Sequence, residues 1–164
     1  MITSLGIIEG YYGRIYTEAE RQSLISFISD IGYSYYIYAP KNDCSLRLKW
    51  DDKFSKEKID FLKRLSLYCK NNSIEFGIGI SPLAITSDLK KYLPILLNKV
   101  DFFVKELKTK VIAILFDDIK LYTDDEGIHQ KEIMNKIASY LASNFPSTNV
   151  RLAFCPTYYS FDPI

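Results

Sequence analysis

The sequence predicts an α/β fold, namely a partial (β/α)8 (TIM) barrel that contains the first four βα units and a fifth strand. Two observations lead to this prediction. Short apolar segments of strand character alternate with longer segments of helical period through the 164 residues. Polar and aromatic residues follow the strand segments, as they do where a barrel assembles a site from the carboxyl ends of its strands. We therefore expect residues 1–164 to be the amino-terminal part of one barrel domain.

Five short apolar segments are expected to form the strands, and each is followed by a polar or glycine-bearing loop. Successive apolar residues without polar alternation are typical of parallel strands that are covered on both faces. The clearest example is the run VIAILF, in which β-branched residues are frequent. The expected strands are 5–8, 35–39, 75–80, 111–116 and 151–155.

Two helices are expected between the first three strands. The first begins at a capping box, in which Thr17 and Glu20 can each satisfy the other's backbone N–H, and it ends at Gly32. The second is expected over 55–70, with Asn71 and Asn72 ending it. Apolar residues form one stripe on each segment, which is the face that a helix packs on a sheet.

Two more helices are expected before the last strand. The third has an apolar stripe that ends at Leu107, and we expect Pro94 in its first turn, where a missing N–H costs nothing. The fourth is expected over 130–143. Strand and helix thus alternate four times before a fifth strand, which is typical of βαβ units that build a parallel sheet.

Two architectures fit this alternation: an open doubly wound sheet, or the first part of an eight-unit barrel of about 250 residues. A nucleotide-binding doubly wound sheet carries a glycine-rich turn after its first strand. The segment GIIEGYYGR separates its glycines by bulky aromatics, so it makes a poor phosphate cradle. Polar or aromatic clusters follow the strands at 10–13, 41–43, 81–82, 117–118 and 157–159, and this distribution favours the barrel.

Charge and cysteine content argue against several classes of protein. The chain has 21 basic and 20 acidic residues and a formal net charge of +1, so nothing favours binding to nucleic acid or to an anionic membrane. Its three cysteines form no CxxC pair and it has one histidine, so neither a disulfide framework nor a zinc site is expected. No signal peptide or apolar stretch of about 18 residues is seen, which favours a cytoplasmic location.

Asp117 and Asp118 directly follow the apolar run at 111–116. Neighbouring carboxylates repel each other, which favours one anion beside one proton donor. Hydrolysis of an acetal needs these two roles. The pair could also cap a turn or bind a divalent cation, and the local sequence leaves these alternatives open.

Five strings of the sequence resemble, in order and at fitting spacing, glycoside hydrolase family 84. They are GIIEGYYGR, YIYAPKND followed by Arg47 and Trp50, GISP, AILFDDI and FCPTYY. Members of that family are β-N-acetylglucosaminidases, including protein O-GlcNAcases and bacterial enzymes once called hyaluronidases. The resemblance implies a retaining hydrolase that needs no cofactor and removes terminal β-linked N-acetylglucosamine (GlcNAc) from a glycoprotein or glycan. The substrate's own 2-acetamido oxygen would act as the nucleophile and form an oxazoline.

The resemblance also implies roles for individual residues. Asp117 would accept the acetamido N–H and orient that group, and Asp118 would protonate the leaving oxygen and then deprotonate water. Adjacent strand residues point to opposite faces, so this division requires the backbone to turn at Asp117. Arg47 and Trp50 are expected to give structural support.

Four further positions match substrate-binding residues of the family. Gly10 would let the backbone approach the sugar, Lys41 would bind its hydroxyls, Tyr159 would assist the acetamido oxygen, and Cys155 would lie near the acetyl group. Without the resemblance, each has an ordinary alternative: a turn, a solvated lysine, a core tyrosine and an inert buried thiol.

The sequence departs from the family at Asn42, where aspartate is usual, at 15–16, where Pro-Trp is common, and after Pro82, where glycine is usual. The family also takes sugar-binding residues from later strands. A half-barrel leaves an open edge and an apolar face, so we expect a remaining segment, a separate chain or self-association to complete it. Two other functions stay open: a non-catalytic GlcNAc-binding module, and metal-dependent phosphoryl chemistry, for which a phosphate cradle is lacking.

Overall fold

The computed structural model describes residues 4–119 and 125–158. Its single sheet has five parallel strands in the order β1-β2-β3-β4-β5. Each strand therefore pairs with the next strand in sequence. In a doubly wound sheet, by contrast, the order of the strands reverses at a switch point. The strands are β1 (Gly6–Glu9), β2 (Tyr35–Tyr38), β3 (Glu75–Ile80), β4 (Val111–Leu115) and β5 (Arg151–Cys155).

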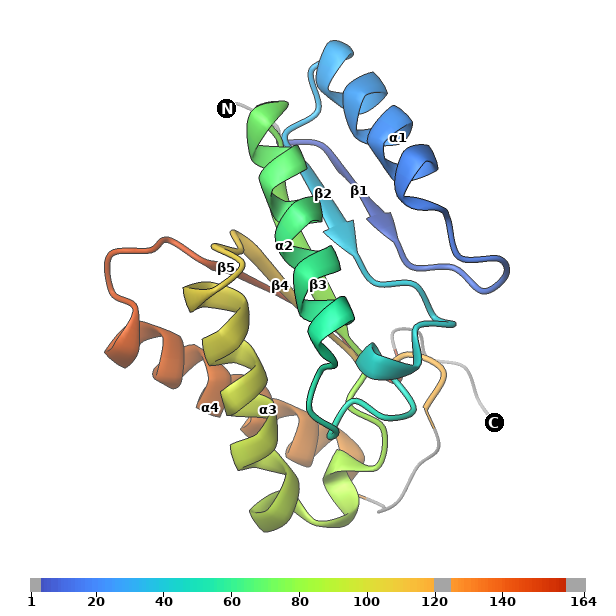
Figure 1. Ribbon diagram of the computed structural model, residues 1–164. Coiled ribbons are helices and arrows are strands. Elements are labelled where there is room, and N and C mark those ends of the chain that lie inside the picture. The colour runs from blue at the N-terminus through green and yellow to red at the C-terminus, as the bar shows by residue number, and fades with distance from the viewer. Residues whose placement is uncertain (1–3, 120–124, 159–164) are drawn as a thin grey trace.

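Four helices cover one face of the curled sheet (Figure 1), and within the described ranges no helix lies on the other face. Sequential parallel strands with all helices outside form the arrangement of a (β/α)8 barrel, here present as its first half. This confirms the predicted fold class. The helices are α1 (Glu18–Asp30), α2 (Lys56–Asn71), α3 (Leu89–Lys105) and α4 (Glu126–Asn144), with short 3₁₀ turns η1 (Cys44–Leu46) and η2 (Ile85–Ser87).

The helix ends show where local sequence rules held and where they failed. The predicted capping box is present, because the Glu20 N–H donates to Thr17 Oγ1 at 3.2 Å and the Thr17 N–H donates to Glu20 Oε2 at 2.7 Å. The prediction for Pro94 was wrong. Asp88 caps α3 by accepting from the Lys91 N–H at 3.1 Å, so the helix begins at Leu89 and Pro94 lies inside it. The first turn of α4 also precedes the predicted start, since Gly127 weakens the helical pattern there.

The main core lies between the sheet and the helices. Alternate strand residues such as Tyr36, Ile78 and Ile112 point to this side, where each is fully buried. Burial of side chains of this size stabilises the fold by about 1.5–3 kcal/mol each. The helices contribute Ile25 and Ile28, Leu62 and Leu65, Leu96, Val100 and Phe103, and Ile133 and Ile137.

The opposite, inner face of the sheet is built from smaller residues. Ala39, Gly79 and Ala113 meet there so closely that a Cβ on Gly79 would lie 2.6 Å from the Cβ of Ala39. The intervening strand residues Ile37, Val111 and Leu115 complete this inner cluster. The inner cluster corresponds to the interior of a barrel, where converging strands leave little room.

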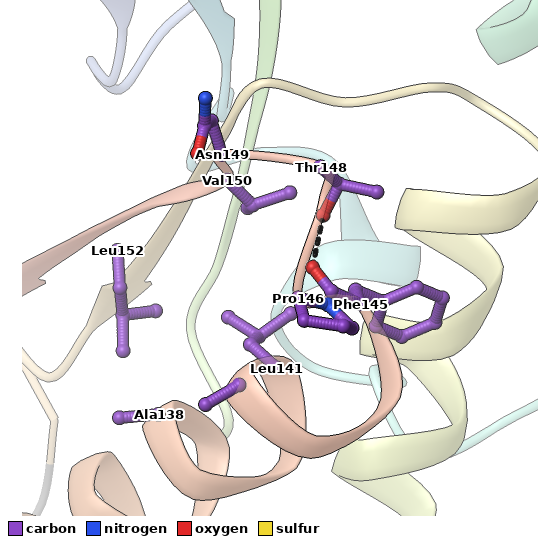
Figure 2. A pocket seen from close by; sticks show the side chains of 9 residues that line it. Ala138, Leu141, Phe145, Pro146, Thr148, Asn149, Val150 and Leu152 are labelled. Carbon is purple, nitrogen blue, oxygen red and sulfur yellow. Dashed lines mark hydrogen bonds between the residues drawn. The ribbon is translucent and has the colours of Figure 1, made fainter.

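Two apolar regions of the half-barrel are left uncovered by the described residues. Ile8 and Phe154, on the two outermost strands, are 46% and 45% exposed. Figure 2 shows a pocket where α4 ends and β5 begins, lined by apolar side chains that include Leu141, Val150 and Leu152. In a complete barrel, the next helix would pack on this position.

We expect a polypeptide of residues 1–164 alone to self-associate at micromolar concentrations, because both outer strands and the inner face would meet water. Sedimentation velocity should give a mass above the 19.0 kDa of one chain. A stable monomer that binds no hydrophobic dye would contradict this prediction. As for membrane crossing, the described part of the chain contains no helix of sufficient length and apolarity.

Candidate active site

The strand alternation brings four of the predicted site residues to one side of the sheet. Gly10, Lys41 and Asp117 each lie two residues after an inner-face residue, and Cys155 is itself packed against the inner cluster. All four lie at or just beyond the carboxyl ends of their strands. The sheet therefore collects them at one end of the half-barrel, where barrel enzymes place their sites.

Asp117 is held by Lys41. The Lys41 Nζ donates to Asp117 Oδ2, and the lysine side chain is 3% exposed while that of the aspartate is 20% exposed. The second oxygen, Oδ1, is buried and has no hydrogen-bond partner among residues 4–119 and 125–158. A buried carboxylate oxygen without a donor is costly, so it is suited to accept an N–H from a bound molecule.

Asp118 points elsewhere. Its φ is 55°, which is the left-handed region that aspartate tolerates better than most side chains, and the residue is exposed. The backbone turn spans both aspartates, with its left-handed residue at Asp118 rather than Asp117. Two adjacent carboxylates can therefore reach two different groups of one bound molecule.

Two contacts surround Asp118. Its backbone carbonyl accepts a hydrogen bond from Arg47 Nη2 at 2.9 Å, and its Oδ2 accepts from the Tyr12 hydroxyl at 3.4 Å. Tyr12 lies after β1 and Arg47 after β2, whereas Asp118 lies after β4. Three separate loops thus meet at Asp118.

The loop that carries Lys41 is fixed by a buried network below it. Asp43 accepts from the Tyr38 hydroxyl at 2.6 Å and from the Ser45 N–H at 3.1 Å, and it forms an ion pair with Lys58. This network holds the chain two residues beyond Lys41. Burial lowers the pKa of the Lys58 ammonium, and Asp43 opposes that effect.

Asn42, the departure from the family pattern, has a clear structural contact. Its Nδ2 donates to the Gly13 carbonyl at 2.6 Å, and the neighbouring Lys41 N–H donates to the Tyr11 carbonyl at 3.2 Å. Both bonds tie the loop after β2 to the loop after β1. An ionised aspartate has no proton to donate, so asparagine is the residue that can make the first of these bonds.

Gly10 follows a strongly anchored strand end. The preceding residue, Glu9, is buried, accepts two bonds from Arg21 at 2.9 and 2.8 Å, and accepts a further bond from Tyr36. A Cβ placed on Gly10 would meet Ile8 Cγ1 at 3.4 Å, which is an ordinary contact. The fold therefore has no need for glycine here, which leaves the approach of a ligand as a reason for it.

Cys155 lies beside the aspartates, next to a second anchored segment. Burial raises the pKa of its thiol, and the charge of Asp117 adds to this effect, so the sulfur stays a neutral thiol near pH 7. The Cys155 carbonyl accepts from the Phe116 N–H at 2.8 Å. The Thr157 hydroxyl donates to the Phe116 carbonyl at 2.8 Å, and the buried Gln130 donates to that hydroxyl at 2.7 Å. These bonds fix β5 against the start of the Asp117 turn.

Comparison with known proteins decides the family. The sequence profile of the β-N-acetylglucosaminidase family matches residues 5–162. The chain belongs to the β-N-acetylglucosaminidase family. The protein O-GlcNAcases of Rattus norvegicus and Mus musculus are each 33% identical to it over 163 residues. These matches cover 94% of this chain but 17% of each relative, so the chain spans about a sixth of their length.

Two solved structures carry the same fold. An O-GlcNAc hydrolase mutant of Thermobaculum terrenum superposes with a TM-score of 0.84 at 26% identity and covers 97% of this chain. The protein CpGH84B superposes with a TM-score of 0.80 at 27% identity and covers 95% of this chain. The chain corresponds to 36% and 27% of these two structures. The resemblance to glycoside hydrolase family 84 is thereby confirmed.

For this β-N-acetylglucosaminidase family member, the sequence did not single out every residue at the site. Tyr12 and Gln130 were not proposed, although Tyr12 lies in the quoted string GIIEGYYGR. Trp50 fits its expected supporting role, since it is buried and its Nε1 donates to the Leu83 carbonyl at 2.8 Å. Tyr159 lies outside the described residues. The described ranges contain no group of three or more His, Cys, Asp or Glu side chains that could hold a metal ion.

Proposed function

We propose that this chain supplies the acid/base part of a retaining β-N-acetylglucosaminidase that removes terminal β-linked GlcNAc from a glycoprotein or glycan. The observation that carries the proposal is that the two neighbouring aspartates differ in their contacts and in their exposure to solvent. Asp117 forms an ion pair with Lys41 and keeps one buried oxygen without a hydrogen-bond partner among the described residues. Asp118, in contrast, is exposed to solvent. Family membership supports the same assignment.

In the first step, Asp117 Oδ1 accepts the substrate's acetamido N–H and directs the acetamido oxygen at the anomeric carbon. That oxygen attacks as the bond to the leaving oxygen breaks, and Asp118 gives its proton to the leaving oxygen. The product is an oxazoline that keeps the acetamido proton as an oxazolinium ion, so its positive charge lies beside the Asp117 carboxylate. A fixed anion at that place stabilises the transition state more than the ground state.

In the second step, Asp118 takes a proton from water. Loss of this proton makes the water oxygen a stronger nucleophile, and it attacks the anomeric carbon. This attack opens the oxazoline and restores the acetamido group. Two displacements at one carbon give net retention of configuration. Asp118 returns to its protonated form, ready for another cycle.

Lys41, Cys155 and Tyr159 complete the proposal. The Lys41 ammonium has three donors, so it can hold Asp117 and still donate to a sugar hydroxyl. The neutral thiol of Cys155 offers an apolar contact for the acetyl methyl group. The role of Tyr159 stays a prediction from the family resemblance. A cytoplasmic location stays a prediction from the sequence, in which no signal peptide is seen.

The experiment that tests this function compares two chromogenic substrates on the full-length gene product that contains this chain. We expect release of 4-nitrophenol from the N-acetyl-β-glucosaminide and none above background from the β-glucoside, which lacks the acetamido nucleophile. Equal hydrolysis of both would contradict substrate assistance. Saturable binding of GlcNAc without any hydrolysis would favour the non-catalytic binding module.

Gly10→Ala should raise KM about 10-fold or more and change the free energy of unfolding by less than about 0.5 kcal/mol, because the added methyl meets the sugar rather than the fold. The matched control is Gly79→Ala, whose methyl would lie 2.6 Å from the Cβ of Ala39. That control should lower stability by about 1–3 kcal/mol. Steady-state kinetics and urea denaturation measure the two effects, and an unchanged KM in Gly10→Ala would remove Gly10 from the site.

A further inference from the structure

The geometry points to Arg47 as a positioning residue for Asp118. Acting with Tyr12, Arg47 holds the proposed acid/base in the left-handed conformation that turns its carboxylate away from Asp117. This inference rests on the proposed function, because it assigns Arg47 an effect on the proton transfer made by Asp118. The family resemblance gave Arg47 only a general supporting role.

The backbone of Asp118 is in a conformation that requires an external restraint. A residue other than glycine at φ 55° is held against a steric preference, and such a conformation persists only when its surroundings impose it. The bond from Arg47 Nη2 to the Asp118 carbonyl, at 2.9 Å, is a direct restraint on that peptide. It joins residues 71 positions apart in sequence, so it comes from the tertiary fold and not from the turn itself.

Arg47 also contacts Tyr12. The Arg47 guanidinium lies 5.5 Å from the centroid of the Tyr12 ring, within the range of a cation–π contact. The hydroxyl of the same ring lies 3.4 Å from Asp118 Oδ2. Arg47 therefore fixes Asp118 at two points, at the carbonyl directly and at the carboxylate through the orientation of Tyr12.

The Arg47 guanidinium is itself only partly satisfied by hydrogen bonds. Its Nη1 is buried and has no hydrogen-bond partner in the described part of the chain. A buried charged donor left in this way weakens the fold, and such costs are typical of functional sites. Lysine could not replace the contact fully, because its ammonium lacks the planar fork that bonds the carbonyl while stacking on a ring.

The test separates proton donation from all other causes of lost activity. In the full-length gene product, Arg47→Met keeps the length of the side chain but removes the donor and the charge. Rates are measured on a 2,4-dinitrophenyl and a 4-methoxyphenyl N-acetyl-β-glucosaminide. The first leaving group departs without a proton and the second requires one. We expect kcat/KM to fall about 10- to 100-fold on the methoxyphenyl substrate and less than about threefold on the dinitrophenyl substrate.

Two further variants keep the test decisive if Arg47→Met folds poorly. Arg47→Lys, which retains a charge and a donor, should show the same selective loss to a smaller extent. Tyr12→Phe removes only the hydroxyl that contacts Asp118 Oδ2 and should also lose rate selectively on the methoxyphenyl substrate. The matched control is Arg64→Met, because Arg64 is a surface arginine that pairs with Glu18 and should leave both rates unchanged.

The measured rates distinguish failure of the role proposed for Arg47 from failure of the proposed function. Equal losses on both substrates, or no loss on either, would overturn the role of Arg47, since a structural defect or a bystander does not distinguish leaving groups. Inactivity of the wild-type protein on both substrates would instead overturn the proposed function, and it would be seen before any variant is compared.

Discussion

Asp118→Asn should lower kcat about 10²- to 10⁴-fold on an N-acetyl-β-glucosaminide with a poor leaving group, because the amide cannot donate the proton that the leaving oxygen needs. Asparagine tolerates the left-handed backbone at this position, so the variant should fold normally. On a 2,4-dinitrophenyl substrate, the first chemical step should be little affected. Steady-state and burst kinetics on the two substrates measure the difference.

The control for this variant is Asp30→Asn, which makes the same chemical change at the exposed last residue of α1. Its kcat should equal that of the wild type. Full activity of Asp118→Asn on the poor leaving group would exclude Asp118 as the acid/base.

Asp117→Asn should lower kcat about 10²- to 10³-fold on every leaving group alike, because formation of the oxazoline precedes or accompanies departure whichever group leaves. The loss of charge also leaves the Lys41 ammonium buried without its partner. Removing one member of such a pair costs about 3 kcal/mol of stability. Kinetics across a leaving-group series and urea denaturation measure these two effects.

A double variant separates the two consequences of Asp117→Asn. Adding Lys41→Met removes the unpaired charge, so the free energy of unfolding should recover while kcat stays low. If kcat recovered together with stability, Asp117 would have only a structural role. The loss of kcat should therefore depend on the leaving group for Asp118→Asn but not for Asp117→Asn. This difference follows from the different positions of the two carboxylates.

Much of the fold could be predicted from the spacing of hydrophobic residues along the sequence. The five apolar segments became the five strands, and the capping box at Thr17 set the start of α1 as expected. The start of α3 was missed because the cap at Asp88 outweighed the usual preference for proline in a first turn. Such outcomes depend on which of several competing local signals the tertiary fold favours.

Less of the site could be predicted, because its decisive contacts cross between loops. The sequence placed two carboxylates at a strand end and predicted a backbone turn at Asp117, but it did not indicate that Asp118 would be the left-handed residue. The contacts of Arg47 and Tyr12 with Asp118 span 71 and 106 residues, and no local pattern encodes them. The bond from Asn42 to Gly13 likewise appears only when the first two loops are brought together.

The central claim is that the substrate's acetamido group is the nucleophile and that Asp117 orients it. The most direct measurement is kcat/KM of the full-length gene product on a series of 4-nitrophenyl glucosaminides whose acetyl group carries zero, one, two or three fluorines. Each fluorine weakens the acetamido oxygen as a nucleophile, so we predict a steep and steady fall in kcat/KM along the series. A flat series would contradict substrate assistance and with it the role assigned to Asp117.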